Sequence, residues 1–189
     1  MGHASIALAE RFPHLNFVVQ DLAEIVAAGE SELPSGLKNR VTFQTHDFFT
    51  PQPVQGADVY LLRFILHDYS DTHATRILKN LLPAFKPTSR LLVMDGVLPE
   101  PGTMPKSEER LIRYASGSRE PSSQRNSLAD KNNRVMDLEM LTNFNSKERD
   151  IEDWRSLFTK ADPRLKLRKV TKPPGSVNSI VEAVLEEVE

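Results

Sequence analysis

The chain has 189 residues, of which 39% are hydrophobic and 26% are charged, and its formal net charge is −2. This is the composition of one globular domain with a sizeable core, and it gives no general attraction to nucleic acid or to an anionic membrane. The absence of cysteine excludes disulfides, thiol nucleophiles and thiolate zinc sites, and it fits a reducing compartment such as the cytoplasm. No stretch approaches the roughly 20 apolar residues that a membrane span needs.

Apolar runs and helical patterns alternate through the first half of the chain. Taken in order, the pattern predicts a helix over 5–12, a strand over 15–19, a helix over 21–29, strands over 40–44 and within 57–66, a helix over 71–85 and a strand over 89–98. The helix over 71–85 carries an apolar stripe of Ile77, Leu81 and Leu82, and Asp71 is placed to cap its start. Strands that alternate with helices predict an α/β fold with a mostly parallel sheet.

A polar stretch interrupts this alternation from about residue 101 to residue 133. It is rich in Ser, Arg, Lys, Glu and Asn, which is typical of a solvated insertion, and its mixed charges favour a solvated face over a binding patch. A helical pattern follows over 135–144, with Met136 and Met140 on one side. Methionines at this spacing are more often core residues than pocket residues.

The C-terminal part returns to regular patterning. Residues 150–162 predict an amphipathic helix that buries Ile151, Trp154 and Phe158. Two strands follow, joined by the turn signal TKPPG, and they predict a closing antiparallel hairpin.

The run LLRFILHD ends in two titratable residues, His67 and Asp68. We expect the strand to stop at this pair and to place it at the edge of the sheet, where α/β proteins hold their ligands. Taken alone, His67 is better explained as a capping or packing residue.

Polar residues also follow the other strands. Asp21 ends the first strand and is placed to accept the hydroxyls of a ribose, although it could merely cap the next helix. Asp47, followed by Phe48, could hydrogen-bond and stack an adenine, or it could be a turn residue beside core aromatics. With Arg63 one strand further on, these residues together favour a nucleoside site more than any of them does alone.

Five blocks of sequence resemble, in order, the S-adenosylmethionine-dependent O-methyltransferases of the plant caffeate/flavonoid type and their fungal secondary-metabolite relatives. They are GHASIALAERFPHLNFVVQDL, HDFFTPQP with ADVYLLRFILHDYSD, LLVMDGVLPEPG, NSKERDIEDWRSLFTKA and PGSVNSIVEAV. The resemblance covers nearly the whole chain apart from the polar insertion. It implies one catalytic domain over 1–189 with a Rossmann-like methyltransferase sheet, S-adenosylmethionine as cofactor and a hydroxylated small molecule as methyl acceptor.

The resemblance also implies roles for individual residues. Its cofactor-binding positions are Gly2 as the last glycine of the cofactor loop, Asp21 at the ribose, Leu22 beside it, Asp47 and Phe48 at the adenine, and Arg63 at the methionine portion, where the family usually has Lys. It makes His67 the general base and places Glu148 and Glu182 on either side of it. Met140 and Asp68 are the implied contacts of the acceptor.

The chemistry explains why such residues are needed. Methyl transfer to a hydroxyl requires the acceptor to lose a proton, and a phenol of pKa near 10 loses it to a histidine of pKa near 6.5 at a cost of roughly 5 kcal/mol. A carboxylate beside the imidazolium offsets part of this cost and fixes the tautomer. No clustered carboxylates or histidine pairs suggest a metal.

Relative to the family, the sequence begins at the last glycine of the cofactor loop. We therefore expect a sheet that lacks its first strand, and a chain without the N-terminal helical domain through which full-length relatives form homodimers. Two alternatives to an active methyltransferase stay open. One is a non-catalytic remnant or a partner-dependent pseudoenzyme, and the other is a cyclase that keeps the cofactor as a structural or electrostatic element.

Overall fold

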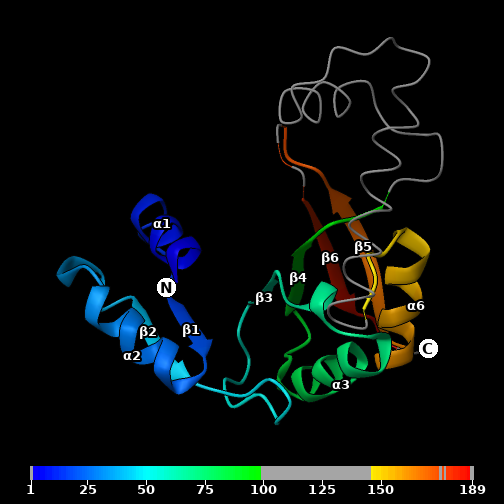
Figure 1. Cartoon of the computed structure of the whole chain (residues 1–189), viewed down its shortest axis with the longest axis horizontal. Helices are drawn as coiled ribbons and strands as arrows, with labels where there is room; N and C mark the ends of the chain where they lie inside the picture. Colours follow the sequence, from blue (N-terminus) through cyan, green and yellow to red (C-terminus); the bar gives the residue numbers. More distant parts are fainter. Residues whose placement is uncertain (1, 99–145, 175, 177, 188–189) are drawn as a thin grey trace. The chain divides into compact units, whose positions relative to one another are not determined.

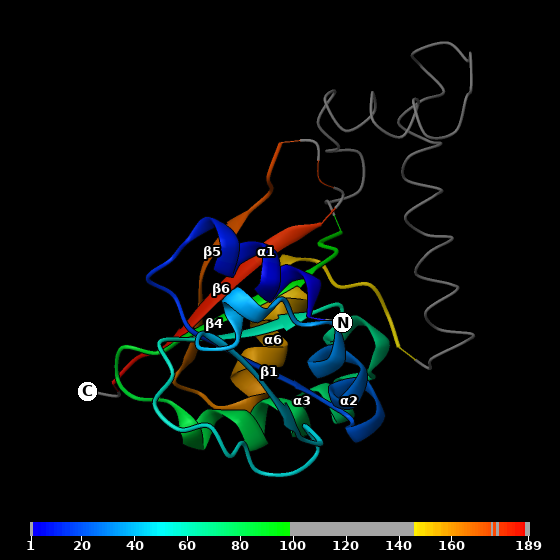
Figure 2. The same ribbon diagram turned by 90° about the vertical axis from the view of Figure 1, so that its left-hand side faces the viewer.

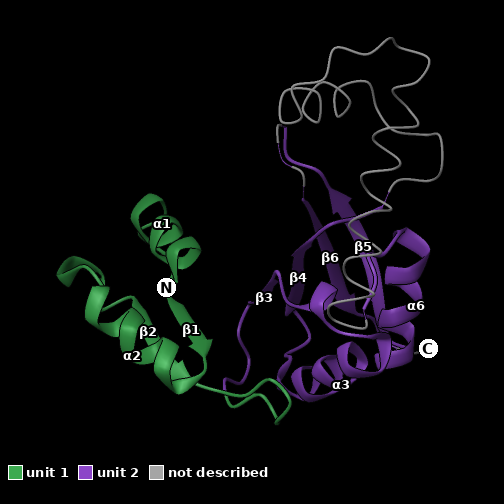
Figure 3. Cartoon of the chain, in the orientation of Figure 1, with its two compact units in different colours: residues 1–53 green, residues 54–189 purple. Residues whose placement is uncertain are grey.

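The computed structural model describes residues 2–98, 146–174, 176 and 178–187 (Figure 1). The chain divides into two compact units, residues 1–53 and residues 54–189, each with a sheet of its own (Figure 3). The polar insertion and the predicted helix over 135–144, with Met140, lie outside the described residues.

The first unit is built on a two-stranded parallel sheet. Its elements are α1 (His3–Arg11), β1 (Phe17–Asp21), α2 (Ala23–Glu32), the 3-10 turn η1 (Ser35–Leu37) and β2 (Val41–Thr45). Ala9, Leu37 and Val41 form its buried centre. Gly29 lets α2 pack closely, because a Cβ at this position would lie 2.3 Å from the Phe43 ring.

The second unit holds a four-stranded mixed sheet in the order β3-β4-β6-β5. Its elements are β3 (Val59–Arg63), the 3-10 turn η2 (Leu66–Asp68), α3 (Asp71–Leu81), the 3-10 turn η3 (Leu82–Ala84), β4 (Arg90–Asp95), α6 (Ile151–Ala161), β5 (Leu165–Thr171) and β6 (Ser179–Leu185). β3 and β4 are parallel, whereas β6 runs antiparallel to both β4 and β5. The predicted C-terminal hairpin is therefore confirmed, and the fold is α/β with a mixed sheet.

Helices α3 and α6 lie on the same face of this sheet (Figures 1 and 2). The core between them and the sheet is apolar, and Trp154 and Phe158 from α6 are fully buried in it. The predicted stripe on α3 is also buried, with Ile77 at 1% exposure. Asp150 begins α6, since its side chain accepts a hydrogen bond from the backbone N–H of Asp153 at 2.8 Å.

Three local predictions were wrong. The third strand ends at Arg63 rather than at His67, because the backbone of Phe64 turns into the left-handed region at φ 53°. Asp71 is the first residue of α3 and Ser70 is its N-cap, without a side-chain capping bond. Ile151 stands at the exposed start of α6, with 41% exposure, instead of facing the core.

Candidate active site

His67 is carried by the turn η2, immediately beyond the carboxyl end of β3. Phe64 reverses the chain out of the strand, and its amide donates to the carbonyl of Met94 on the neighbouring strand β4 at 3.1 Å. The Phe64 ring lies 5.9 Å from the imidazole. A histidine beyond the end of a parallel strand is at the edge where ligands bind in α/β folds.

Carboxylates face both ring nitrogens of His67. Nδ1 lies 3.8 Å from Oε1 of Glu148, and Nε2 lies 3.4 Å from Oδ1 of Asp68. The contact with the Glu148 carboxylate is the largest influence that raises the pKa of His67, burial opposes the rise, and the charges of Asp95, Asp68 and Glu148 add to it. The imidazole is therefore set up to accept a proton and to hold it as an imidazolium.

Asp95 is a further acid of this cluster, which the sequence reasoning missed. It is the last residue of β4 and has no exposed surface. The backbone N–H of His67 is close enough to favour the ionised form of this carboxylate, but neither oxygen has a hydrogen-bond partner of normal geometry among the residues that the structure describes. Burial raises the pKa of Asp95 to about 7, against the opposing charge of His67.

The signal for Asp95 was present in the sequence. An acid followed by glycine closes the apolar run LLVMDG, which is the position of a functional group at a strand end. Gly96 itself matters, because a Cβ there would lie 2.6 Å from Oε2 of Glu148. The glycine lets the Glu148 carboxylate approach this end of the sheet.

The placement of Glu182 beside His67 was wrong. Glu182 pairs with Leu92 in the antiparallel ladder, and side chains alternate between the two faces of a strand. Glu182 therefore lies on the face of Leu92, whereas Asp95 lies on the opposite face. The Glu182 carboxylate accepts a hydrogen bond from Nη1 of Arg90 at 2.6 Å, at the far end of β4 from Asp95.

The first unit brings together the two acids expected at a nucleoside. Asp21 ends β1, and its carbonyl accepts a hydrogen bond from the amide of His46, next to Asp47, at 3.0 Å. Asp47 caps its own turn by accepting from the amide of Phe49 at 2.8 Å. Both acids thus lie at the carboxyl edge of the same two-stranded sheet, and these two hydrogen-bond acceptors fit the hydroxyls and exocyclic amine that a nucleoside donates.

The remaining predicted cofactor residues are placed as follows. Leu22 is the N-cap of α2, is 61% exposed, and donates its amide to Oδ1 of Asp21 at 2.8 Å. Gly2 begins α1 at φ 66°, a conformation that favours glycine. Phe48 makes an edge contact with Phe49, at 5.1 Å between ring centroids. Arg63 belongs to the second unit, where its guanidinium lies 4.5 Å from the centre of the Phe64 ring.

Two classes of feature were not found within the described ranges. No helix there is long and apolar enough to cross a membrane. No group of three or more His, Cys, Asp or Glu residues in the same ranges is arranged to hold a metal ion.

Comparisons with known proteins agree with the geometry. The model of the O-methyltransferase domain family matches residues 1–120. The O-methyltransferase pgmB of Aspergillus terreus is 47% identical over 189 residues, which is 97% of this chain and 38% of that protein. This chain thus spans less than half of that relative.

Solved structures of related fold include an O-methyltransferase and a pericyclic reaction enzyme. The O-methyltransferase NcsB1 from neocarzinostatin biosynthesis, in complex with S-adenosylmethionine and 2-hydroxy-5-methyl naphthoic acid, superposes with a TM-score of 0.71 at 28% identity, covering 98% of this chain and 46% of that one. A structure described as a pericyclic reaction enzyme superposes with a TM-score of 0.74 at 30% identity. The superposition covers 98% of this chain and 40% of the chain of that enzyme.

Proposed function

Because the chain belongs to the O-methyltransferase domain family, we propose that it binds S-adenosylmethionine and transfers a methyl group to a hydroxyl of an aromatic or polyketide-like small molecule, with His67 as the general base. The observation that carries this proposal is the contact between His67 and Glu148 beyond the carboxyl end of β3, close enough to the buried Asp95 at the end of β4 for the two charges to interact. The family relationship supports the reaction class, and the acid–base cluster supports the role of His67.

The cofactor, when bound, supplies an electrophilic methyl group. Asp21 would accept the ribose hydroxyls, and Asp47 with Phe48 would hold the adenine. Arg63 would lie at the methionine portion. Asp21 and Asp47 fit S-adenosylmethionine because two carboxylates at one sheet edge can accept hydrogen bonds from the hydroxyls and the amine of its nucleoside.

The acid–base step is assigned to the chain's own residues. Since Nδ1 of His67 faces Glu148, Nε2 is the nitrogen that takes the acceptor's proton. The present contact of Nε2 with Asp68, whose side chain is 38% exposed, would be replaced by the hydroxyl. By raising the pKa of His67, Glu148 narrows the gap to a phenol of pKa near 10, so the proton transfer costs less.

A second function is favoured by one comparison. Because a pericyclic rearrangement transfers no methyl group, the similarity to a pericyclic reaction enzyme at 30% identity supports a role in which the substrate is rearranged and no methyl group is transferred. In that case His67 would donate or accept a hydrogen bond on a rearranging substrate. The two functions differ in whether S-adenosylhomocysteine is produced.

The test is a turnover assay with a panel of hydroxylated naphthoic acids and simple phenols. The chain is incubated with S-adenosylmethionine, and S-adenosylhomocysteine and methylated product are quantified by mass spectrometry. We expect both to form in equal amounts, and His67→Ala to form neither. A folded chain that binds S-adenosylmethionine but releases no S-adenosylhomocysteine with any acceptor contradicts methyl transfer and favours the cyclase; absence of binding favours a remnant.

A further inference from the structure

The turn that carries His67 is poorly held by its own backbone. The amides of Asp68 and Tyr69 donate to the carbonyls of Ile65 and Leu66 over 3.2 and 3.3 Å, which are long for such bonds. The residue that leads into the turn, Phe64, has a φ of 53°, in a region that costs free energy for a bulky side chain. The position of His67 therefore depends on support from elsewhere in the chain.

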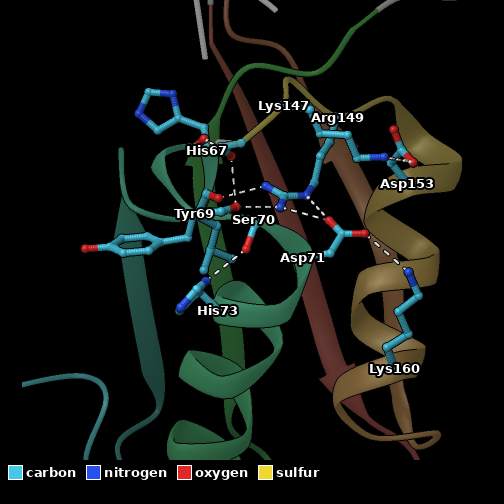
Figure 4. A network of polar contacts seen from close by, with 11 residues as sticks. His67, Tyr69, Ser70, Asp71, His73, Lys147, Arg149, Asp153 and Lys160 are labelled. Atoms are coloured by element: carbon cyan, nitrogen blue, oxygen red, sulfur yellow. Dashed lines mark hydrogen bonds and ion pairs between the residues drawn. The ribbon is translucent and has the colours of Figure 1, made fainter. Parts of the chain in front are cut away.

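That support comes from a short segment distant in sequence, residues 146–149. The Ser146 hydroxyl lies 2.5 Å from the carbonyl oxygen of His67 and 2.8 Å from that of Tyr69. Arg149 donates from Nη1 to the carbonyl of Leu66 at 2.7 Å and from Nη2 to that of Tyr69 at 2.9 Å (Figure 4). These bonds are shorter than those within the turn, and the guanidinium bonds are strengthened by charge.

Arg149 can remain buried and charged while it donates to the carbonyls of the turn, because Asp71 pairs with its guanidinium. It is 1% exposed, and its Nη2 lies 3.0 Å from Oδ1 of Asp71 at the start of α3. Burial works against the ionised form of Asp71, but the hydrogen bonds from Arg149 and Lys160 outweigh it and lower the pKa of Asp71. In Figure 4 the guanidinium lies between the carbonyls of the turn and Asp71, and the ring of His67 points away from it.

The same segment also carries Glu148. While Ser146 and Arg149 hold the backbone of the turn from one side, the Glu148 carboxylate meets Nδ1 of His67. The segment is itself tied down, since the amide of Leu98 donates to the carbonyl of Arg149 at 2.9 Å. One short segment thus sets both the position of the backbone of His67 and the partner of its ring.

We propose that Ser146 and Arg149 are positioning residues, which fix the turn of residues 66–69 so that His67 meets Glu148 and presents Nε2 to the acceptor. The inference rests on the proposed function of His67, but the geometry it describes is present without substrate. Ser146 and Arg149 touch no reacting atom, and they act only through the carbonyls of the turn.

The test uses the full chain and reads His67 directly, by an NMR titration of its ring nuclei. In the wild-type chain we expect a midpoint above the ordinary value of about 6.5, because of Glu148. Ser146→Ala and Arg149→Lys should lower this midpoint toward the ordinary value, since the relaxed turn takes the ring away from Glu148. Lysine keeps a charge for Asp71 but lacks the planar fork that reaches two carbonyls.

Matched variants separate positioning from simple loss of stability. Ser146→Thr keeps the hydroxyl and should restore the wild-type midpoint. Lys160→Met removes the other ion pair of Asp71, at 3.2 Å, without touching the turn, and should leave the midpoint unchanged. In a Glu148→Gln background, Ser146→Ala should no longer shift the midpoint.

A folded Ser146→Ala or Arg149→Lys chain with an unchanged His67 midpoint would overturn the proposal. Once an acceptor is known, both variants should also lower kcat by roughly 10²-fold while the affinity for S-adenosylhomocysteine stays the same. Failure of methyl transfer in the wild-type chain would contradict the proposed function but would leave the titration, and so the positioning role, to be decided separately.

Discussion

Oε1 of Glu148 lies 3.8 Å from Nδ1 of His67, and the absence of a side chain at Gly96 makes room for that carboxylate. The two residues come from segments far apart in the sequence, which meet beyond the ends of β3 and β4. Their contact converts an ordinary histidine into a stronger base.

Replacing the base should stop the reaction without emptying the cofactor site. We expect His67→Ala to lower methyl transfer by about 10²- to 10⁴-fold, because the acceptor loses the group that takes its proton. Binding of S-adenosylhomocysteine, measured by calorimetry, should be unchanged. His73→Ala, a histidine of α3 that contacts Ser70 at 2.9 Å, is the control and should keep its activity. Turnover close to wild type in His67→Ala would remove the proposed role.

The Glu148 carboxylate should set the pH dependence. Glu148 raises the pKa of His67, and a general base works when deprotonated, so the acid limb of the rate profile should lie above the ordinary pKa of about 6.5. In Glu148→Gln this limb should move to lower pH, and the maximal rate should fall. If the acid limb of the pH–rate profile is at the same pH in Glu148→Gln as in the wild-type chain, a group other than His67 paired with Glu148 controls that limb.

The same linkage predicts an effect on stability. A histidine whose pKa is raised by folding stabilises the fold fully below its unfolded pKa of about 6.5, and this stabilisation is lost as the pH rises through the folded pKa. Glu148→Gln should therefore destabilise the chain more in acid than in alkali, as measured by urea unfolding across pH. Equal destabilisation at every pH would contradict the contact.

The raised pKa of Asp95 makes the free energy of unfolding depend on pH in the opposite direction to that of a salt-bridged acid, whose pKa is lowered. Folding raises its pKa from 3.8 to about 7, so within that window the folded chain holds a proton that the unfolded chain has lost, and the free energy of unfolding falls as the pH rises. Asp95→Asn should remove this dependence, which is on the order of 4 kcal/mol across the window. Because Asp95 and His67 interact, the measured midpoints belong to the pair.

A matched control exists for Asp95. Asp58 is exposed and pairs with Lys86, which lowers its pKa, so Asp58→Asn should change the pH dependence of stability in the opposite direction. If Asp95→Asn leaves the slope of stability against pH as in the wild type, Asp95 is not the buried acid described here.

Glu182 should be dispensable for the chemistry. Its carboxylate binds Arg90 on the face of β4 opposite to Asp95, so Glu182→Gln should retain methyl transfer. A double-mutant cycle with Arg90→Gln should give a coupling of about 0.2–1 kcal/mol, as expected for a pair that is half exposed on the arginine side. Loss of activity in Glu182→Gln would restore the role inferred from the sequence.

Patterning predicted the elements well where one periodicity runs without interruption. The stripe of α3 and the buried Trp154 of α6 follow from apolar spacing, and the closing hairpin follows from two strand patterns joined by a turn signal. The end of β3 did not, because Phe64 continues the apolar run while its backbone leaves the strand. An apolar pattern predicts which residues are buried, but it does not predict that the backbone of one of them has a positive φ.

The site was predicted in part for a similar reason. His67 and Glu148 were recognised, and the structure brings them together. Asp95 was overlooked within a strand, and Glu182 was assigned in its place, because the register of β6 against β4 decides which face each acid occupies. Register depends on contacts between distant segments, which a single sequence does not display.

The most direct test of the account is calorimetric titration of the chain with S-adenosylhomocysteine, with Asp21→Ala and the surface variant Glu24→Ala in parallel. We expect binding in the wild-type chain and in Glu24→Ala, and its loss in Asp21→Ala, because Asp21 is the residue that we propose to hold the ribose. A folded wild-type chain that binds no S-adenosylhomocysteine, or an Asp21→Ala chain that binds it equally well, would contradict the account.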